Sequence, residues 1–232
     1  MSAKLIATTQ PAPWLVEQGI RTAEDLIVYT ARVSNPSNQG NVETGGRLIR
    51  YCIDHGHWSV FETASMTVEI ETTRAIAAQI LRHRSFTFQE FSQRYCDVQA
   101  LGRPTVPAAR MQDRKNRQSS IESYDEALQE WWISEAGRVM DEAHAAYEAA
   151  LEKGIAKEVA RFVLPLATPT RLYMTGSVRS WFHYLKARLD PATQQEHRQV
   201  AIDVADVFSE TFPVISEACG VWKKAVDLFL AD

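Results

Sequence analysis

The segment from residue 66 to residue 82 constrains the fold most, because the spacing of its apolar residues changes within a few positions. Met66-Thr67-Val68-Glu69-Ile70-Glu71 alternates apolar and polar residues, which is typical of a half-buried strand. From Thr73 to about Arg82 the apolar residues recur every three to four positions, which predicts a helix. The chain is therefore expected to combine a sheet with helices.

Other local patterns predict the remaining elements. We expect strands at Lys4–Thr8 and at Arg171–Thr175, and Gly176 is expected to end the second strand. Helices are expected at Thr22–Val33, around Leu48–Ile53, at Ser123–Lys153 as one helix or two stacked ones, and at Ile155–Leu164. Two further helices are expected from Asp190-Pro191 onward and around Val214, Ile215, Val221 and Ala225. The segment with Phe86, Phe88 and Phe91 is expected to be a loop, and the basic stretch 102–120 a mobile surface excursion. Trp131, Trp132 and Trp181 are interpreted as core or subunit-interface residues. No repeat and no linker is found, so residues 1–232 are predicted to form one domain.

Charge and cysteine content limit the classes of function. The chain has 25 Lys and Arg against 29 Asp and Glu, a net charge of −4, so any affinity for anions must be local. Cys52, Cys96 and Cys219 form no CxxC or zinc-ligand spacing, which favours a reducing cytoplasm. No apolar run approaches the roughly 18 residues that cross a bilayer, so no membrane partner is predicted.

Several common motifs are missing from the sequence. It has no GxGxxG, no P-loop and no GxSxG elbow, so any nucleotide must be bound in another way. His55 and His57 have no third ligand at a recognised spacing, so no metal is predicted.

Residues 82–95 carry the densest chemistry of the chain. They hold three arginines, one histidine, one glutamate and a tyrosine among several hydroxyl side chains. Arginine binds phosphate and carboxylate in a bidentate manner, so the cluster suits an anionic ligand such as a nucleotide phosphate. A structural role stays open on physical grounds: Arg82 and Arg84 can cap a helix, and Glu90 can pair with Arg94.

The same segment resembles a known signature. Arg82-His83-Arg84, seven residues and then Ser92 is similar to the motif of the flavin-dependent thymidylate synthases. The resemblance extends to Glu90, Arg94 and Tyr95, to Ala31-Arg32-Val33-Ser34, to His55-Gly56-His57 and Phe61-Glu62, and to Glu158-Val159-Ala160-Arg161 and Leu164-Pro165-Leu166. It covers roughly residues 31–208 and implies an α+β fold, a central β-sheet packed with helices, in a single-domain subunit.

A few positions depart from the family pattern. Thr87, Gln89 and Ser59 are small polar changes that keep hydrogen-bonding capacity. His183 stands where an asparagine near the flavin is expected, and Ala192 where a histidine is usual. These two changes affect the flavin affinity that the resemblance implies.

The resemblance implies an activity. Such enzymes reductively methylate dUMP to dTMP with methylenetetrahydrofolate as the one-carbon donor and NADPH-reduced FAD as the hydride source, and they release tetrahydrofolate. No enzyme nucleophile is implied: Arg188, the catalytic residue, reaches the pyrimidine from a neighbouring subunit and activates dUMP electrostatically. Ser92 lacks a partner base and is assigned to substrate binding. A homotetramer with sites shared between subunits follows from the same resemblance.

The resemblance also implies the site residues. The dUMP residues are Gln79, Ile80, Leu81, Arg82, Glu90, Phe91, Ser92, Gln93, Arg94, Arg161 and Arg188. The FAD residues are Ser59, contributed by another subunit, and Arg82, His83, Arg84, Glu90, Ser177, Val178, Arg179 and His183. His57 is placed on the folate side. Taken singly, Arg161 can also be a surface arginine, and Arg179 and Arg188 ordinary helix cations.

Two other functions fit part of the sequence. A nucleic-acid-binding module would use Arg82–Arg94 and the basic Arg103–Arg117 stretch. A helical interaction protein would use the arginines structurally. Neither accounts for the spacing of His83, Glu90 and Ser92, so the synthase is preferred and no nucleic-acid partner is predicted.

Overall fold

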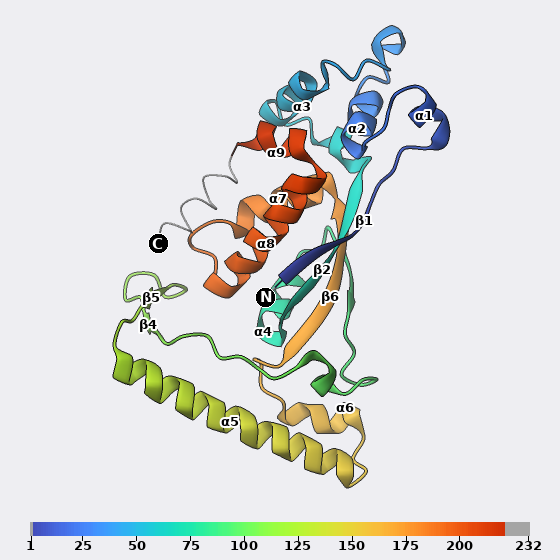
Figure 1. Ribbon diagram of the computed structural model, residues 1–232. Coiled ribbons are helices and arrows are strands. Elements are labelled where there is room, and N and C mark those ends of the chain that lie inside the picture. The colour runs from blue at the N-terminus through green and yellow to red at the C-terminus, as the bar shows by residue number, and fades with distance from the viewer. Residues whose placement is uncertain (1, 221–232) are drawn as a thin grey trace. The chain divides into compact units, whose positions relative to one another are not determined.

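The computed structural model describes residues 2–220 and confirms the mixture of sheet and helices (Figure 1). The strands are β1 (Ser2–Thr8), β2 (Ser65–Thr73), β3 (Thr87–Glu90), β4 (Arg110–Gln112), β5 (Ser120–Glu122) and β6 (Pro169–Ser177). The helices are α1 (Pro13–Glu17), α2 (Ala23–Ala31), α3 (Gly45–Asp54), α4 (Arg74–Ile80), α5 (Glu126–Glu152), α6 (Lys157–Ala160), α7 (Val178–Arg188), α8 (Gln195–Thr211) and α9 (Pro213–Cys219). In the described part of the chain, no helix has both the length and the apolar character needed to cross a membrane.

The described chain divides into two compact units. Unit 1 comprises residues 2–70, 83–88 and 173–220, and unit 2 comprises residues 71–82 and 89–172. The division crosses β2 after Ile70 and β6 after Leu172. That residues 1–232 form a single domain stays a prediction.

The larger sheet has the strand order β1-β2-β6-β3. Its two central strands are antiparallel, because Thr67 on β2 contacts Thr175 on β6 through the hydroxyls at 2.8 Å, and two residues further along Tyr173 donates to Glu69 at 2.8 Å. Side chains along β2 alternate between half-buried and buried, as the sequence pattern predicts. The strand therefore has one face in the core.

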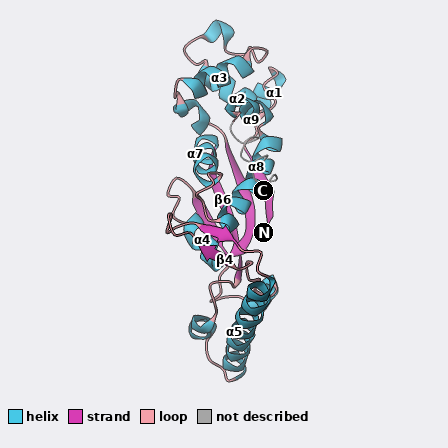
Figure 2. Ribbon diagram, turned by 90° about the vertical axis from the view of Figure 1, so that its left-hand side faces the viewer, coloured by secondary structure: helices cyan, strands magenta, loops and turns pink. Residues whose placement is uncertain are grey.

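In unit 1, helices cover the sheet (Figure 2). Helix α8 packs against β1 and α7, and α9 packs against α3 and α8. Trp181 of α7 is fully buried and donates from Nε1 to the Met66 carbonyl at 3.1 Å, so its predicted core position is confirmed. The predicted start of α2 is also confirmed: the Thr22 hydroxyl accepts from the Asp25 amide, and the Asp25 carboxylate accepts from the Thr22 amide.

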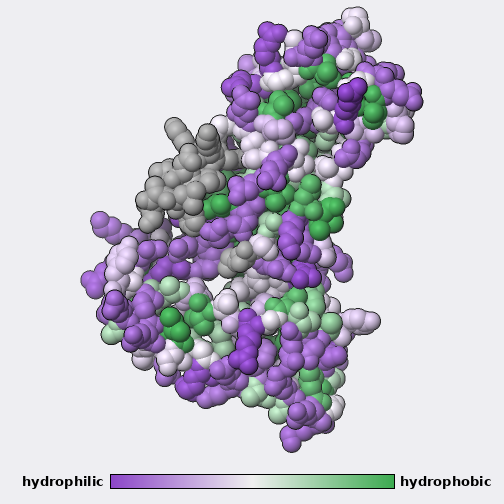
Figure 3. Space-filling view, viewed as in Figure 1, coloured by the Kyte–Doolittle hydropathy of each residue, from purple (hydrophilic) through white to green (hydrophobic). Residues whose placement is uncertain are grey.

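In unit 2, the region 123–153 contains one long helix rather than two. Helix α5 has 27 residues, and its Tyr147 is buried against Val98 and Ala160. Trp131, by contrast, is 59% exposed, so it is not a core residue of this chain, and its alternative place in a subunit interface stays a prediction. Figure 3 shows, on the face in view, apolar surface broken into patches by polar side chains.

Three predicted elements need correction. The Phe86–Phe91 segment contains strand β3, and the basic stretch 102–120 contains β4, which pairs antiparallel with β5. The predicted helix at 155–164 is the short α6 followed by a 3₁₀ turn at Arg161–Val163.

Two boundaries near the end of β6 also differ from the prediction. Gly176 lies inside β6, and α7 follows directly although the sequence pattern predicts no helix there. Helix α8 begins at Gln195 and not at Asp190-Pro191, because the Asp190 carboxylate accepts from the Ala192 amide at 2.8 Å and closes a turn. Val221 and Ala225 lie outside the described residues.

Candidate active site

The residues predicted for the site divide between the two units. In unit 1 are His57, Ser59, His83, Arg84, Ser177, Val178, Arg179, His183 and Arg188. In unit 2 are Gln79, Ile80, Leu81, Arg82, Glu90, Phe91, Ser92, Gln93, Arg94 and Arg161. The signature segment 82–95 therefore contributes residues to both units.

Arg188 and His83 form a hydrogen-bonded pair in unit 1. Arg188, at the end of α7, donates from Nε to Nε2 of His83 at 2.9 Å. A guanidinium has no acceptor, so Nε2 must supply the lone pair, and His83 is the neutral tautomer with its proton on Nδ1. No described residue accepts from the two terminal nitrogens of Arg188, so they are available to a ligand.

Tyr184 packs against the His83 ring, and His197 lies beside the Tyr184 hydroxyl. The rings of Tyr184 and His83 meet edge to face with 4.9 Å between centroids, and the Tyr184 hydroxyl lies 3.2 Å from Nε2 of His197. Both supporting side chains are buried, and burial, followed by the charge of Arg188, lowers the pKa of His197 to about 3. Burial likewise raises the pKa of Tyr184. Arg188 is therefore the cation of this cluster at neutral pH.

Phe86 anchors the segment that carries His83 and Arg84. Its ring packs edge to face on Trp181 at 4.8 Å, and the Ser180 hydroxyl donates to the Ser85 carbonyl at 3.2 Å. Gly176 of β6 lies so close that a Cβ there would come within 2.4 Å of the ring. A glycine is needed at this position because the Phe86 ring occupies the space of a side chain.

The start of α7 holds most of the other residues predicted to bind FAD. The Ser177 hydroxyl accepts from the Ser180 amide at 3.2 Å and caps the helix, and Arg179 pairs with Glu62 at 3.1 Å. His183 lies beside the Trp58 ring with 4.8 Å between centroids, and burial and the Arg179 charge lower its pKa. An 11-residue helix that begins beside an arginine suits an anionic group, so the donor set of unit 1 fits the diphosphate of a flavin dinucleotide.

In unit 2, Glu90 is held by residues that the sequence analysis did not single out. Its Oε1 accepts from Arg74, the first residue of α4, and from the Thr170 hydroxyl at 2.9 Å. The open alternative, a Glu90–Arg94 pair, is wrong. Arg94 instead lies 3.4 Å from Glu158.

A cavity of about 430 Å³ lies beside this ion pair. It is lined by Ser92, Arg94, Tyr95, Ala156, Lys157 and Glu158. The Ser92 carbonyl accepts from the amides of Tyr95 and Cys96, which closes a tight turn, and Lys157 approaches the Tyr95 carbonyl at 3.4 Å. Two cations and a hydroxyl suit a phosphate. The only sequence signal for Lys157 was its place beside the matched residue Glu158.

The other dUMP residues predicted in unit 2 differ in their exposure and contacts. Ile80 is fully buried, whereas Leu81 is 37% exposed. The Gln93 side chain is buried, and its Nε2 has no hydrogen-bond partner among the described residues. The guanidinium of Arg161 lies 5.9 Å from the centroid of the exposed Phe162 ring.

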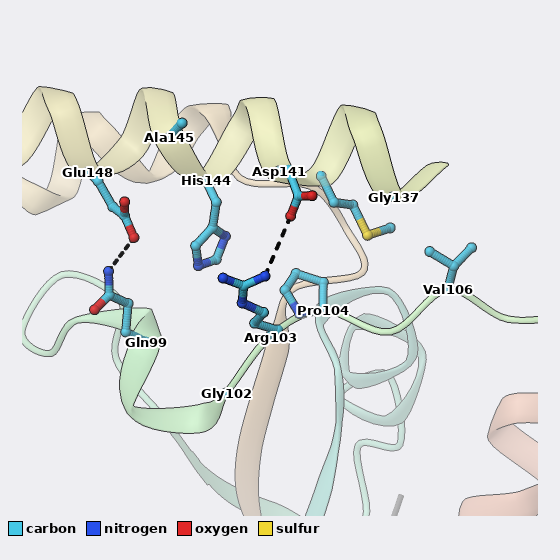
Figure 4. A pocket seen from close by; sticks show the side chains of 11 residues that line it. Gln99, Gly102, Arg103, Pro104, Val106, Gly137, Asp141, His144, Ala145 and Glu148 are labelled. Carbon is cyan, nitrogen blue, oxygen red and sulfur yellow. Dashed lines mark hydrogen bonds and ion pairs between the residues drawn. The ribbon is translucent and has the colours of Figure 1, made fainter. Parts of the chain in front are cut away.

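A larger cavity of unit 2, of about 570 Å³, contains none of the predicted residues (Figure 4). It lies between α5 and the segment 99–106, which are joined by Gln99–Glu148 at 2.5 Å and Arg103–Asp141 at 4.0 Å. The described residues hold no group of three side chains that fits a metal ion.

Comparison with known proteins identifies first the fold of the chain and then its family. The fold matches that of PolB from Streptomyces cacaoi, a UMP/dUMP methylase bound with 5-Br dUMP, with a TM-score of 0.79 and 27% identity over 94% of this chain and 93% of that one. The α+β fold is thus that of a nucleotide methylase. The sequence model described as "Thymidylate synthase complementing protein" matches residues 15–214.

Two relatives resemble the chain over nearly its full length. It is 52% identical over 218 residues to the probable flavin-dependent thymidylate synthase of Paramecium bursaria Chlorella virus 1, covering 94% of this chain and 98% of that protein. It is 48% identical over 219 residues to the flavin-dependent thymidylate synthase of Synechocystis sp., covering 94% and 99%. The chain belongs to the flavin-dependent thymidylate synthase family.

Proposed function

We propose that this chain methylates dUMP reductively to dTMP. Methylenetetrahydrofolate supplies the one-carbon unit and leaves as tetrahydrofolate, and FAD reduced by NADPH supplies the hydride. The names of the relatives and the 5-Br dUMP bound to the structural neighbour support this function. We further propose that the chain forms one domain and acts in the cytoplasm as a homotetramer whose subunits share their sites.

The hydrogen bond from Arg188 to His83 carries the proposal. His83 holds the guanidinium through Nε and, being neutral, leaves its positive charge uncompensated. A cation beside the uracil ring stabilises negative charge as the ring becomes nucleophilic at C5, so no enzyme nucleophile is required. The two terminal nitrogens of Arg188 are the donors that we assign to the pyrimidine, in the site of a neighbouring subunit.

The remaining dUMP contacts are assigned by chemistry. Arg94, Ser92 and Lys157 line the 430 Å³ cavity and are assigned to the phosphate, with Arg161 as a further cation. Glu90 repels a phosphate and is assigned to an N–H or O–H of the nucleoside. The other dUMP contacts that we propose are Gln79, Ile80, Leu81, Arg82, Phe91 and Gln93.

FAD is assigned mainly to residues of unit 1. Arg84 and Arg179, with the start of α7 at Ser177 and Val178, offer charge and N–H donors for the diphosphate. The further FAD contacts that we propose are Arg82, His83, Glu90, His183 and a neighbouring subunit's Ser59, and His57 is assigned to the folate side. When bound, the flavin supplies redox chemistry, while the protein orients it and sets its electrostatic environment.

The test is dTMP formation by the purified chain from dUMP and methylenetetrahydrofolate with FAD, with and without NADPH. We expect product only with NADPH. Arg188→Lys keeps the charge but lacks the side-on Nε–H, so we expect kcat to fall about 100-fold or more while dUMP affinity changes little. Arg138→Lys, at an exposed pair on α5, is the matched control.

Two results would overturn the proposal. One is a folded protein that binds neither flavin nor dUMP but binds oligonucleotides in a salt-dependent way. The other is an Arg188→Lys variant that turns over as fast as the wild type.

A further inference from the structure

The carboxylate of Glu90 is asymmetric in its contacts within unit 2. Arg74 and Thr170 both donate to Oε1, and no described residue donates to Oε2. The Glu90 side chain is 17% exposed, and Thr170 is almost fully buried. One oxygen is therefore held by the protein while the other still has its lone pairs.

Two donors on one oxygen fix more than the position of the carboxylate. A glutamate terminus rotates broadly about its last torsion, so an unheld side chain presents its oxygens in many directions. With Oε1 held from α4 by Arg74 and from β6 by Thr170, the direction of Oε2 is set as well. Preorganised acceptors of this kind bind a ligand donor without paying for side-chain ordering at the moment of binding.

We propose that Arg74 and Thr170 are positioning residues that aim Oε2 of Glu90 at an N–H or O–H donor of the bound nucleoside. This inference rests on the proposed function and goes beyond it, because neither residue lies in the motif segment 82–95. The ligand group that faces Oε2 is an N–H or O–H of the nucleoside and not the phosphate, because a carboxylate accepts a hydrogen bond from an N–H or O–H and repels a phosphate. Arg74 and Thr170 themselves make no contact with the ligand.

The experiment measures the dUMP dissociation constant and the KM and kcat for dUMP, in Arg74→Met, Thr170→Val and the corresponding double variants with Glu90→Gln. Thr170→Val replaces only the hydroxyl by a methyl and keeps the buried volume, and urea unfolding checks that the variant is folded. We expect each single variant to weaken dUMP binding about fivefold to thirtyfold, in KM more than in kcat. In the Glu90→Gln background the same substitutions should weaken dUMP binding less than about twofold, because positioning residues act only through Glu90.

Arg171→Met is the matched control. It removes an ion pair to Glu71 in the same unit, in which the two side chains are 40% and 39% exposed. If Arg171→Met loses as much dUMP affinity as Arg74→Met, the loss in Arg74→Met is explained by a general loss of stability, and the inference is overturned.

The other outcomes are also decisive. If the wild type binds dUMP and Arg74→Met and Thr170→Val bind it equally well, the positioning role is wrong while the proposed function stands. If the effect of Arg74→Met persists undiminished with Glu90→Gln, Arg74 contacts the ligand directly and the inference fails. A wild type that binds no dUMP overturns the proposed function, and this inference with it.

Discussion

Gly176→Ala tests whether the contact between β6 and Phe86 positions the motif segment. The new Cβ would lie 2.4 and 2.5 Å from two carbons of the Phe86 ring, whereas ordinary contacts begin near 3.4 Å. The ring must therefore move by about 1 Å, or β6 must bend by as much. The ring is 7% exposed and packs on Trp181, so it has little space to move into.

The expected cost follows from overpacking. Forcing one methyl into a filled core typically costs about 1 to 3 kcal/mol, and the closeness of two ring carbons favours the upper half of that range. Because Phe86 lies three residues after His83, the displaced ring also shifts the residue that holds Arg188. We expect a loss of about 2 to 3 kcal/mol of unfolding free energy together with weakened flavin binding.

Urea unfolding and flavin titration check both expectations. Gly137→Ala is the matched control, because a Cβ at that position in α5 meets nothing within 4 Å, and it should stabilise by about 0.5 to 1 kcal/mol. Adding Phe86→Leu to Gly176→Ala should restore part of the lost stability by freeing space. If Gly176→Ala unfolds within about 0.5 kcal/mol of the wild type and binds flavin equally, the reasoning is refuted.

Three further predictions concern stability. The pKa of His197 is about 3 when folded, below its ordinary value of 6.5, so its contribution to stability is present above pH 6.5 and is lost as the pH falls toward 3. His197→Gln should remove about 2 to 3 kcal/mol of the pH dependence of the unfolding free energy between pH 7 and pH 4, and an unchanged slope would contradict this. The pKa of buried Glu24 is raised to about 7 by desolvation, so its contribution is present below pH 4.5 and is lost as the pH rises through 7. Glu24→Gln should therefore be more stable relative to the wild type at pH 8 than at pH 4, by about 1 to 3 kcal/mol in urea titrations. Thr22→Ala removes a helix cap and should cost about 1 kcal/mol of unfolding free energy in urea titrations.

Elements with a strong local pattern were predictable from the sequence. The alternation in β2 and the capping box at Thr22 specify their structures through neighbouring residues alone. Gly176 was not predictable in this way, because the residue that explains it, Phe86, is 90 positions upstream. The Asp190-Pro191 pair carries the signature of a helix start but closes a turn, and α8 begins a few residues later. Local signals of this kind are shared by turns and helices, so they misplace boundaries.

For the candidate site, the motif singles out residues but does not predict their hydrogen-bond partners. Glu90 and Arg94 have the spacing of a helical pair, yet Glu90 ends strand β3 and Arg94 lies in the turn beyond it, so no helical turn brings the two side chains together. Its actual partners, Arg74 and Thr170, come from α4 and β6, and only the paired strands bring them together. Lys157 was missed for a related reason, since no pattern links it to Ser92 before the chain is folded.

Arg94 and Arg188 donate to acceptors of different charge, and this difference matches the two roles proposed for them, phosphate binding and activation of the uracil ring. Arg94 is paired with Glu158, in which the two side chains are 65% and 57% exposed, so the pair contributes little and a dianionic phosphate can replace Glu158. Arg188 is paired with a neutral histidine, so its charge acts on whatever lies beyond its terminal nitrogens. A carboxylate in place of His83 would hold Arg188 equally well but would cancel that charge. Under the proposed function, the chain therefore places a neutral partner at the arginine assigned to polarise the uracil ring and a charged partner at the arginine assigned to bind the phosphate.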